Sequence, residues 1–290
     1  MSDRRNFIKK ATLGVTAVTL SGATAFSAKS YGRIKGANDR IAVAFMGCGR
    51  RVPAYFDAVT DKKNNIDLLY ICDVMKSQRE NVAAKLQNQL NKKPKLENDV
   101  RKVLQDKELD ALFVAAPDHW HTPAACMAME AGKNVYLEKP CTHNPREGQI
   151  LSAYEKKYKK VVQIGNQQRS APESIDIIGQ IHNGAIGEAY KAVAFYSSSR
   201  DAVPHPKKAP VLDGLDWDLF QGPAPRVPFH DTYWDYNWHW YGWNWGTAES
   251  GNNGTHELDV ARWALKVDYP MHVFVEGAKR HFKDDGWGNV

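Results

Sequence analysis

From Ile41 to about residue 169, short apolar runs alternate with segments of helical periodicity, and this alternation constrains the fold more than any other feature of the chain. Alternating strand and helix patterns are typical of a doubly wound parallel sheet, because each helix returns the chain to the same end of the sheet. We therefore expect an α/β fold with an N-terminal Rossmann-type domain over residues 39–169. Its predicted elements are strands at 41–49, 66–74, 134–140 and 161–169, a strand and loop at 111–121, and helices at 77–90 and 146–158.

The first predicted strand runs into a tight glycine turn that contains Gly47 and Gly49 and is followed by Arg50. The two glycines permit the turn and let a pyrophosphate approach backbone amides at the start of the next helix. Asp73 ends the second strand, where an acid can accept hydrogen bonds from an adenosine ribose. This order of elements predicts a dinucleotide site. Val52 replaces the third glycine of the usual pattern, so we expect a slightly displaced helix and a surviving site.

The same acid bears on the choice of dinucleotide. Asp73 disfavours a 2′-phosphate and therefore favours NAD. Lys76 and Arg79 follow it closely and leave NADP open, although side chains of this kind are more often solvated charges of a helix.

Residues 1–28 have the organisation of an export signal. Arg4 and Arg5 open a basic region, an apolar region of 16 residues runs from Ala11 to Phe26, and small residues near Ala25 offer a cleavage site. The paired arginines resemble the twin-arginine type of signal. A membrane anchor is the alternative, but a span needs roughly 20 strongly apolar residues. We therefore expect a periplasmic protein without stable membrane insertion, in which residues 29–38 form a linker.

Charge and cysteine content argue against a nucleic-acid-binding protein and against a disulfide-rich one. Removing the leader takes away four basic side chains and one acidic one, so the formal net charge falls from +6 to about +3, which does not indicate nucleic-acid binding. The cysteines show neither CxxC spacing nor a disulfide-dense pattern, and we interpret them as reduced structural thiols. They are Cys48, Cys72, Cys126 and Cys141.

Several motifs together resemble the Gfo/Idh/MocA family of sugar-directed oxidoreductases, and its exported bacterial branch in particular. Besides the glycine turn, the matching stretches are APDHWHTPAACMAMEAGKNVYLEKP (116–140), VVQIGNQQR (161–169), GAIGE (184–188), LDWDLFQGPAPRVPF (215–229) and NNGTHELDVARWAL (252–265). The resemblance implies a second α/β domain with a large open mixed sheet over residues 170–290, for substrate binding and oligomerisation. Only one strand-like run, at 271–282, precedes the end of the chain, so we expect an incomplete sheet. Its exposed edge favours a homo-oligomer.

By the same resemblance, Lys139 is the catalytic-site lysine, which orients a substrate hydroxyl and stabilises developing negative charge. It lies at the carboxyl end of a predicted central strand, and ligands bind at the carboxyl ends of the strands in open α/β sheets. Glu138 and Pro140 are expected to fix the strand end that presents it. The alternative is a surface lysine paired with the neighbouring glutamate.

His256 is the predicted proton carrier, because an imidazole titrates near neutral pH. Asp259 lies three residues further on a predicted helix and shares its face, so it is expected to orient the ring, unless it pairs with Arg262. Many members of the resembled family carry an aspartate four residues before this histidine, where the present chain has Asn252. An amide can bind a sugar hydroxyl but cannot accept its proton, so either His256 acts alone or the reaction differs from simple dehydrogenation.

The remaining candidates concern ligand binding. The aromatic segment 231–245 is either a carbohydrate platform, with Trp240 as a contact, or a buried loop. Arg200 is a further substrate candidate. His119 and His121 form an HxH pair without a third metal ligand, so we expect a loop over the cofactor and no metal site. The residues expected at the cofactor are Gly47, Gly49, Arg50, Asp73, Pro117, His119, His121, Glu138 and Gln167.

These features predict an exported oxidoreductase that transfers hydride from a sugar or glycoside to a nicotinamide. Outside the cytoplasm no free nicotinamide pool is expected, so the cofactor has to stay bound and be restored in the site. A redox-neutral reaction, including glycoside cleavage through a keto sugar, meets this requirement. Two alternatives remain: a nucleotide- or sugar-binding protein without turnover, and an ordinary dehydrogenase whose leader is inert.

Overall fold

The computed structural model describes residues 40–197, 200–241, 244–278 and 281–286. The predicted signal peptide (1–28) and linker (29–38) lie outside the described residues, as does Trp243 of the aromatic segment. None of the described helices is both long and apolar enough to cross a membrane.

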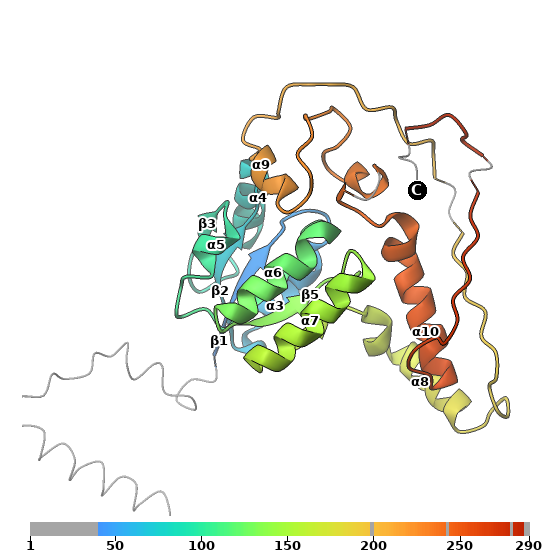
Figure 1. The fold of residues 1–290 in the computed structure, drawn as a ribbon. Coiled ribbons are helices and arrows are strands. Elements are labelled where there is room, and N and C mark those ends of the chain that lie inside the picture. The colour runs from blue at the N-terminus through green and yellow to red at the C-terminus, as the bar shows by residue number, and fades with distance from the viewer. Residues whose placement is uncertain (1–39, 198–199, 242–243, 279–280, 287–290) are drawn as a thin grey trace, which may run out of the picture. The chain divides into compact units, whose positions relative to one another are not determined.

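A parallel sheet of six strands forms the centre of the N-terminal half, in the order β3-β2-β1-β4-β5-β6 (Figure 1). This order confirms the doubly wound Rossmann topology predicted from the alternation of apolar runs. The strands are β1 (Ile41–Met46), β2 (Ile66–Cys72), β3 (Lys95–Glu97), β4 (Ala111–Val114), β5 (Asn134–Leu137) and β6 (Val162–Ile164). Strand β3 was absent from the sequence prediction, because three residues with one apolar side chain carry no periodic signal.

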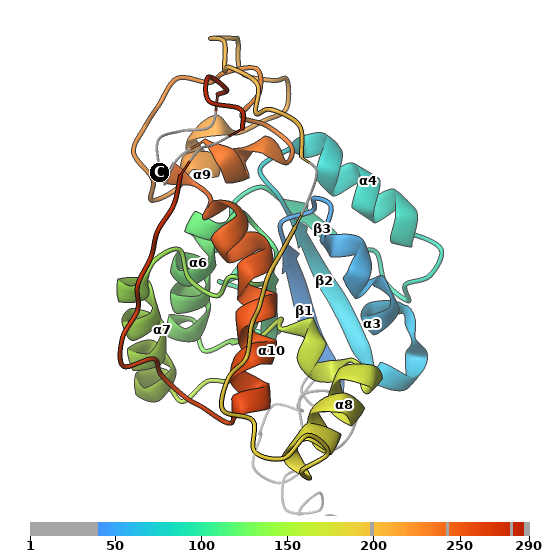
Figure 2. The same cartoon turned by 90° about the vertical axis from the view of Figure 1, so that its right-hand side faces the viewer.

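Helices cover both faces of the sheet, with α6 and α7 on one face and α3 and α4 on the other (Figure 2). Two separate apolar clusters fill these interfaces, one centred on α6 and one on the buried side chains of β1 and β2. The elements of this half are the 3-10 turns η1 (Val52–Tyr55), η2 (Lys62–Asn64) and η3 (Gln167–Ser170), and the helices α3 (Phe56–Thr60), α4 (Lys76–Leu86), α5 (Val100–Val103), α6 (Asp118–Glu130) and α7 (Pro145–Tyr158). All four cysteines are free, as expected of structural thiols.

The described residues after Ser170 contain helices and irregular segments but no strand, so the large second sheet expected for residues 170–290 is not formed. The helices and turns are α8 (Pro172–His182), α9 (Trp217–Gln221), η4 (Asn237–Trp240), the π-helical turn η6 (Ser250–Gly254) and α10 (Thr255–Leu265). A third apolar cluster, around Trp217 and Trp245, holds α9 and the aromatic segment together.

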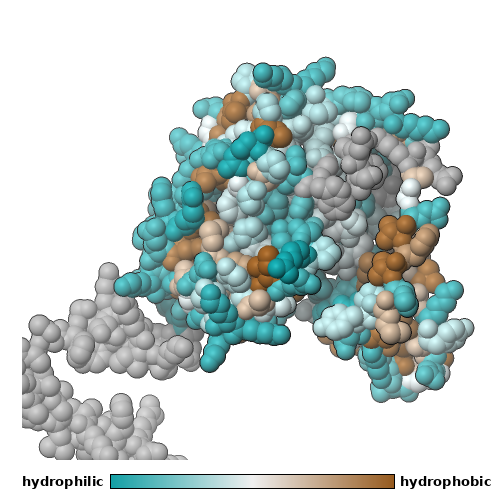
Figure 3. All heavy atoms as spheres, viewed as in Figure 1, coloured by the Kyte–Doolittle hydropathy of each residue, from teal (hydrophilic) through white to brown (hydrophobic). Residues whose placement is uncertain are grey.

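Two segments with strand-like composition, 189–197 and 271–278, run without ladder partners (Figure 1). Their apolar side chains are exposed, for example Phe195 at 80% and Phe274 at 87%. Apolar surface gathers over the region of α8 and α10 (Figure 3). A β-strand is stable only when a neighbouring backbone satisfies its N–H and C=O groups, which explains why strand-like composition did not produce a sheet here.

Candidate active site

A cavity of about 430 Å³ opens at the carboxyl ends of β1, β2, β4, β5 and β6. This edge of an open parallel sheet is where ligands bind in such folds. Most residues predicted from the sequence to contact cofactor or substrate line this one cavity. They are Gly47, Gly49, Arg50, Asp73, Pro117, His121, Glu138, Lys139, Gln167, Asn252 and His256.

The glycine turn begins at Gly47, whose φ of +89° is accessible to glycine at little cost. A Cβ at this position would lie 2.4 Å from the carbonyl oxygen of Ala115. At Gly49, by contrast, a Cβ would meet nothing within 4 Å, so the backbone is open towards the cavity. Val52, which replaces the third glycine, is completely buried and packs in the core as the first residue of η1. The turn therefore survives, followed by a short 3-10 helix.

Asp73 holds this turn against the start of α4. Its carboxylate accepts hydrogen bonds from the backbone N–H of Cys48 at 2.6 Å and of Met75 at 2.8 Å. Burial raises the pKa of this carboxyl, while the two backbone donors act in the opposite direction. The Arg79 guanidinium donates to the main-chain oxygen of Asp73, so a cation lies beside the predicted ribose position. An open glycine turn with a carboxylate at the end of β2 fits the adenosine half of a dinucleotide.

Glu138 is buried at 3% exposure and anchors the other side of the cavity. Its Oε1 accepts hydrogen bonds from Arg51 Nε (2.8 Å), Tyr55 Oη (2.8 Å) and Gln167 Nε2 (3.0 Å). Sequence reasoning assigned Glu138 and Gln167 to the cofactor but missed Arg51 and Tyr55. The position of Arg51 within the glycine turn was the available signal, whereas the contact of Tyr55 depends on the fold.

Lys139 projects from the end of β5 and is held by Asn252 of η6. Its Nζ donates to the backbone oxygen of Asn252 at 2.5 Å and to Asn252 Oδ1 at 3.0 Å. Burial lowers the pKa of the lysine, and the nearby carboxylates of Asp118 and Glu138 partly offset this effect. The solvated pair with Glu138, considered from the sequence, is not formed, because Glu138 bonds elsewhere. The structure thus brings together two of the predicted site residues, Lys139 and Asn252.

His256 is the second residue of α10 and lines the same cavity. Burial and the positive charge of Lys139 lower its pKa, so the ring is neutral at pH 7 and able to accept a proton. Its Nδ1 is buried and has no hydrogen-bond partner within the described part of the chain.

Asp259 does not orient His256, contrary to the sequence-based expectation. Both of its carboxylate oxygens pair with Arg169 of η3, at 2.9 Å each, and this ion pair lowers the pKa of the carboxyl. Arg262, the other partner considered, donates instead to the backbone oxygen of Asp268. Spacing along a helix predicts which side chains share a face, but Arg169 reaches Asp259 from 90 residues away in sequence. Asp259 therefore ties α10 to the end of the Rossmann half.

His119 and His121 lie in the first turn of α6 rather than in a loop over the cofactor. The ring of His119 contacts the carbonyl oxygens of Phe220 (Nε2, 2.8 Å) and Trp245 (Nδ1, 3.2 Å), and it does not line the cavity. His121 contacts the carbonyl oxygens of Pro140 and Ala116. Both rings therefore bind main-chain segments together. No group of three or more potential metal ligands occurs among the residues that the structure describes.

One part of the aromatic segment is buried, and another part lines the cavity, as the two interpretations from the sequence, a buried loop and a carbohydrate platform, would each require. Trp245, at 1% exposure, belongs to the buried cluster, and Trp240 is also buried and does not line the cavity. Trp234, Tyr236 and Trp238 do line it. Arg200 lies with its guanidinium 4.7 Å from the centre of the Trp240 ring and pairs with Glu249, outside the cavity that holds Lys139. Arg200 and Trp240 are thus not brought to the predicted substrate position.

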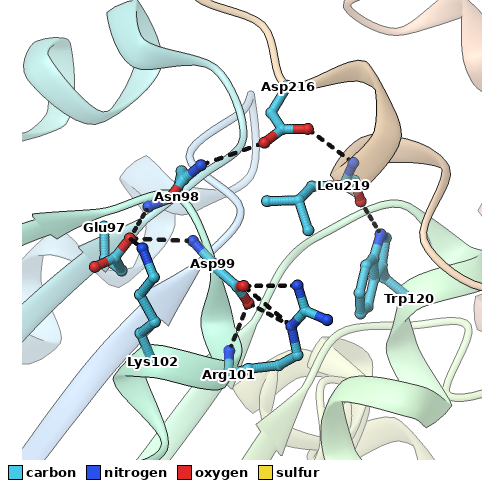
Figure 4. A network of polar contacts seen from close by, with 8 residues as sticks. All are labelled: Glu97, Asn98, Asp99, Arg101, Lys102, Trp120, Asp216 and Leu219. Carbon is cyan, nitrogen blue, oxygen red and sulfur yellow. Dashed lines mark hydrogen bonds and ion pairs between the residues drawn. The ribbon is translucent and has the colours of Figure 1, made fainter.

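A polar network ties helix α9 to the Rossmann half beside the carboxyl end of β3 (Figure 4). Asp216 caps the helix by accepting from Leu219 N at 3.0 Å and also accepts from Asn98 Nδ2 at 3.3 Å. Trp120 of α6 donates from Nε1 to the carbonyl oxygen of Leu219 at 3.0 Å. These contacts join the end of β3 and the first turn of α6 to a segment that lies 118 and 99 residues later in the chain, respectively.

Comparison with known proteins agrees with this geometry. Residues 41–166 match the model of the family described as GFO_IDH_MocA, oxidoreductase family, NAD-binding Rossmann fold. The chain is 27% identical to the D-glucoside 3-dehydrogenase of Escherichia coli (strain K12), over 52% of this chain and 42% of that protein. It is 24% identical to a glycosyl hydrolase family 109 protein of Shewanella sp. (strain W3-18-1), over 67% of this chain and 45% of that protein.

Among solved structures, the WlbA dehydrogenase of Chromobacterium violaceum, in complex with NADH and UDP-GlcNAcA, is similar with a TM-score of 0.55 and 17% identity, over 78% of this chain and 55% of that one. This likeness concerns the fold. The chain spans less than half the length of these two curated relatives. Taken with the glycine turn, Asp73 and Lys139 around one cavity, the matches identify residues 41–166 as an NAD-binding Rossmann domain similar to that of the Gfo/Idh/MocA oxidoreductases.

Proposed function

We propose that this protein oxidises a hydroxyl group of a sugar or glycoside and passes the hydride to a nicotinamide dinucleotide that stays in the site. One observation carries the proposal: Lys139, Asn252 and His256 line the same cavity as the glycine turn and Asp73. A dinucleotide bound along that edge would supply the hydride acceptor. The cofactor is NAD in the first instance, with NADP left open by Arg79.

The residues divide the remaining work between them. Lys139 uses two of its three N–H donors on Asn252, so one donor remains for a substrate oxygen. A cation there stabilises the negative charge that develops on the hydroxyl oxygen as its proton leaves. His256, neutral at pH 7, accepts that proton. Trp234 and Trp238 offer ring faces on which a sugar can stack.

The relatives support a carbohydrate substrate, since one is called a D-glucoside 3-dehydrogenase and another a glycosyl hydrolase. Both names suit a reaction that begins by oxidising a glycoside. The second favours the redox-neutral route, in which the ketone formed in the ring assists cleavage and is then reduced again. This glycoside-cleaving activity is the second candidate function.

Export through the twin-arginine-type leader and a periplasmic location remain part of the proposal. Export of a folded protein would let the chain carry its cofactor with it, which is why a leader and a dinucleotide site can occur together. Association into a homo-oligomer through the exposed apolar segments after residue 186 is also proposed, because large exposed apolar patches usually mark interaction sites.

Purified mature protein provides the test. We expect released nucleotide in about equimolar amount, and incubation with free sugars and aryl glycosides should produce a reduced-nicotinamide signal, aglycone release, or both. Lys139→Ala should lower the rate of hydride transfer by about a hundredfold or more. A protein purified without nucleotide that shows neither signal with any sugar would refute the proposal. If the protein binds sugar and Lys139→Ala matches the wild type in sugar-dependent hydride exchange, a non-catalytic binding protein would be favoured. Uncleaved leader in the cytosolic fraction would contradict export.

A further inference from the structure

Tyr236 lies in the wall of the cavity, yet the proposed hydride transfer gives it no role. We propose that Tyr236 is the general acid of this site and donates its phenolic proton to the departing oxygen of a glycoside. This inference rests on the proposed function, because the departure follows oxidation of the sugar ring. It assigns the site to redox-neutral glycoside cleavage rather than simple dehydrogenation.

The neighbours of Tyr236 determine whether its hydroxyl group donates or accepts a hydrogen bond within the protein. Lys139 carries only donors, so the side-chain oxygen of Asn252 has to face it, and the two atoms are 3.0 Å apart. The amide nitrogen of Asn252 is thereby turned to Tyr236, where Nδ2 donates to Oη at 2.9 Å. The phenolic oxygen accepts this bond, so its own proton is free to be given to a ligand in the cavity.

An aspartate at position 252 would act in the opposite sense. A carboxylate has no N–H to donate, so it would accept the proton of the Tyr236 hydroxyl and hold it away from the ligand. Asn252 is therefore the residue that makes the tyrosine a donor. This gives a role to an amide that cannot itself accept a proton from a substrate hydroxyl.

His256 supplies the complementary group. It lines the cavity from the start of α10, its Nδ1 has no hydrogen-bond partner among the described residues, and burial favours its neutral form. The site thus holds a proton acceptor and a proton donor. Elimination of a poor leaving group from the carbon β to a ketone requires both, whereas oxidation of an alcohol requires an acceptor alone.

The step balances as follows. Oxidation of a ring hydroxyl makes the hydrogen on the adjacent carbon acidic. His256 first passes the hydroxyl proton of the oxidation step to water and then accepts the carbon-bound proton. The C–H electron pair forms a carbon–carbon double bond, the glycosidic C–O bond breaks, and Tyr236 protonates the departing oxygen. Water then adds across the double bond while the phenolate removes a proton from it and the imidazolium returns a proton to carbon. The oxidant is the nicotinamide dinucleotide that the proposed function already requires, and it is regenerated when the ketone is reduced.

The surroundings of Tyr236 suit a phenolate between these steps. The Asn252 amide continues to donate to the charged oxygen, and such charge-assisted bonds are stronger than neutral ones. The guanidinium of Arg50 lies 4.9 Å from the centre of the Tyr236 ring and is held there by an ion pair with Asp235.

The test uses the holo-protein and two glycosides of the sugar that gives the strongest reduced-nicotinamide signal, one with a nitrophenyl and one with a phenyl leaving group. A nitrophenolate departs without help, whereas a phenolate needs a proton. We expect Tyr236→Phe to lower kcat/KM for the phenyl glycoside by about a hundredfold or more. The value of kcat/KM for the nitrophenyl glycoside should change by no more than a few-fold. Oxidation of the free sugar should persist. Tyr233→Phe is the matched control, because Tyr233 packs on the buried aromatic cluster and does not line the cavity.

Equal losses with both glycosides, or no loss with either, would overturn the assignment. A wild-type protein that oxidises sugars without releasing aglycone would also overturn it while leaving the proposed function in place, and absence of any sugar oxidation would refute the proposed function itself. Asn252→Asp provides a second variant should Tyr236→Phe fail to fold. It should show the same selective loss with the phenyl glycoside, and an unchanged ratio of the two rates would count against the proposal.

Discussion

Lowering the pH should destabilise this protein through His119, which is buried at 3% exposure between α6, α9 and the segment at Trp245. Burial lowers the pKa of this imidazole to about 4 in the folded chain, against about 6.5 when it is unfolded. The ring nitrogens face two carbonyl oxygens, which favour the charged form, but the loss of solvation outweighs them.

The sign and size of the effect follow from linkage. Since the folded pKa lies below the unfolded one, the unfolded chain binds more protons as the pH falls below about 6.5, and stability decreases until about pH 4. Between pH 7.5 and pH 5, this one group should remove about 2 kcal/mol from the free energy of unfolding. Burial also lowers the pKa of His239, so this group contributes a loss of the same sign.

Urea unfolding of wild type and His119→Gln at the two pH values isolates the contribution. The glutamine amide can still donate to a carbonyl oxygen but does not titrate, so the pH-dependent loss should be smaller in the variant by about 2 kcal/mol. His272→Gln, at an exposed position, controls for the substitution itself. Equal pH dependence in His119→Gln and the wild type would show that the imidazole is not held neutral, and the reasoning would fail.

Two further predictions concern the cavity and α10. Gly47→Ala should weaken dinucleotide binding by at least about tenfold and destabilise the fold by about 1–3 kcal/mol, because φ is +89° and the new Cβ would lie 2.4 Å from a backbone oxygen. Fluorescence titration and urea unfolding measure the two effects, and binding as tight as in the wild type would contradict the steric argument. Asp259→Asn should cost about 1–3 kcal/mol by weakening the pair with Arg169, while leaving the pH midpoint of sugar oxidation unchanged. A shifted midpoint would instead restore Asp259 as a partner of His256.

The local signals in the sequence predicted the N-terminal half well. Apolar runs of strand length, a glycine turn and an acid at the end of the second strand each depend on contacts within a few residues or on burial on both faces of a sheet. The cavity residues that follow strands could be predicted because parallel strands end on the same side of the sheet, whereas Asn252 and His256 were singled out by the family resemblance. Strand β3 was not predicted, because an edge strand of three residues needs neither length nor apolar character.

Pairings across large sequence separations were beyond the same reasoning. The helical spacing of His256 and Asp259 placed both on α10 correctly, but Arg169, and not the histidine, occupies the space beside the carboxylate. The resemblance to the Gfo/Idh/MocA family likewise implied a second sheet after residue 170. Without a backbone beside them, the strand-like runs are left exposed.

The amino-acid sequence alone therefore determined the parallel sheet and the glycine turn, because periodicity and turn geometry are local properties. It also supplied the lysine, the amide and the histidine that the proposed function uses. Only the tertiary structure decided which groups those side chains meet. That Asn252 turns its oxygen to Lys139 and its nitrogen to Tyr236 depends on three segments brought together by packing. Hydrogen-bond direction between such segments is fixed by which donors and acceptors come into contact, and no spacing along the chain encodes it.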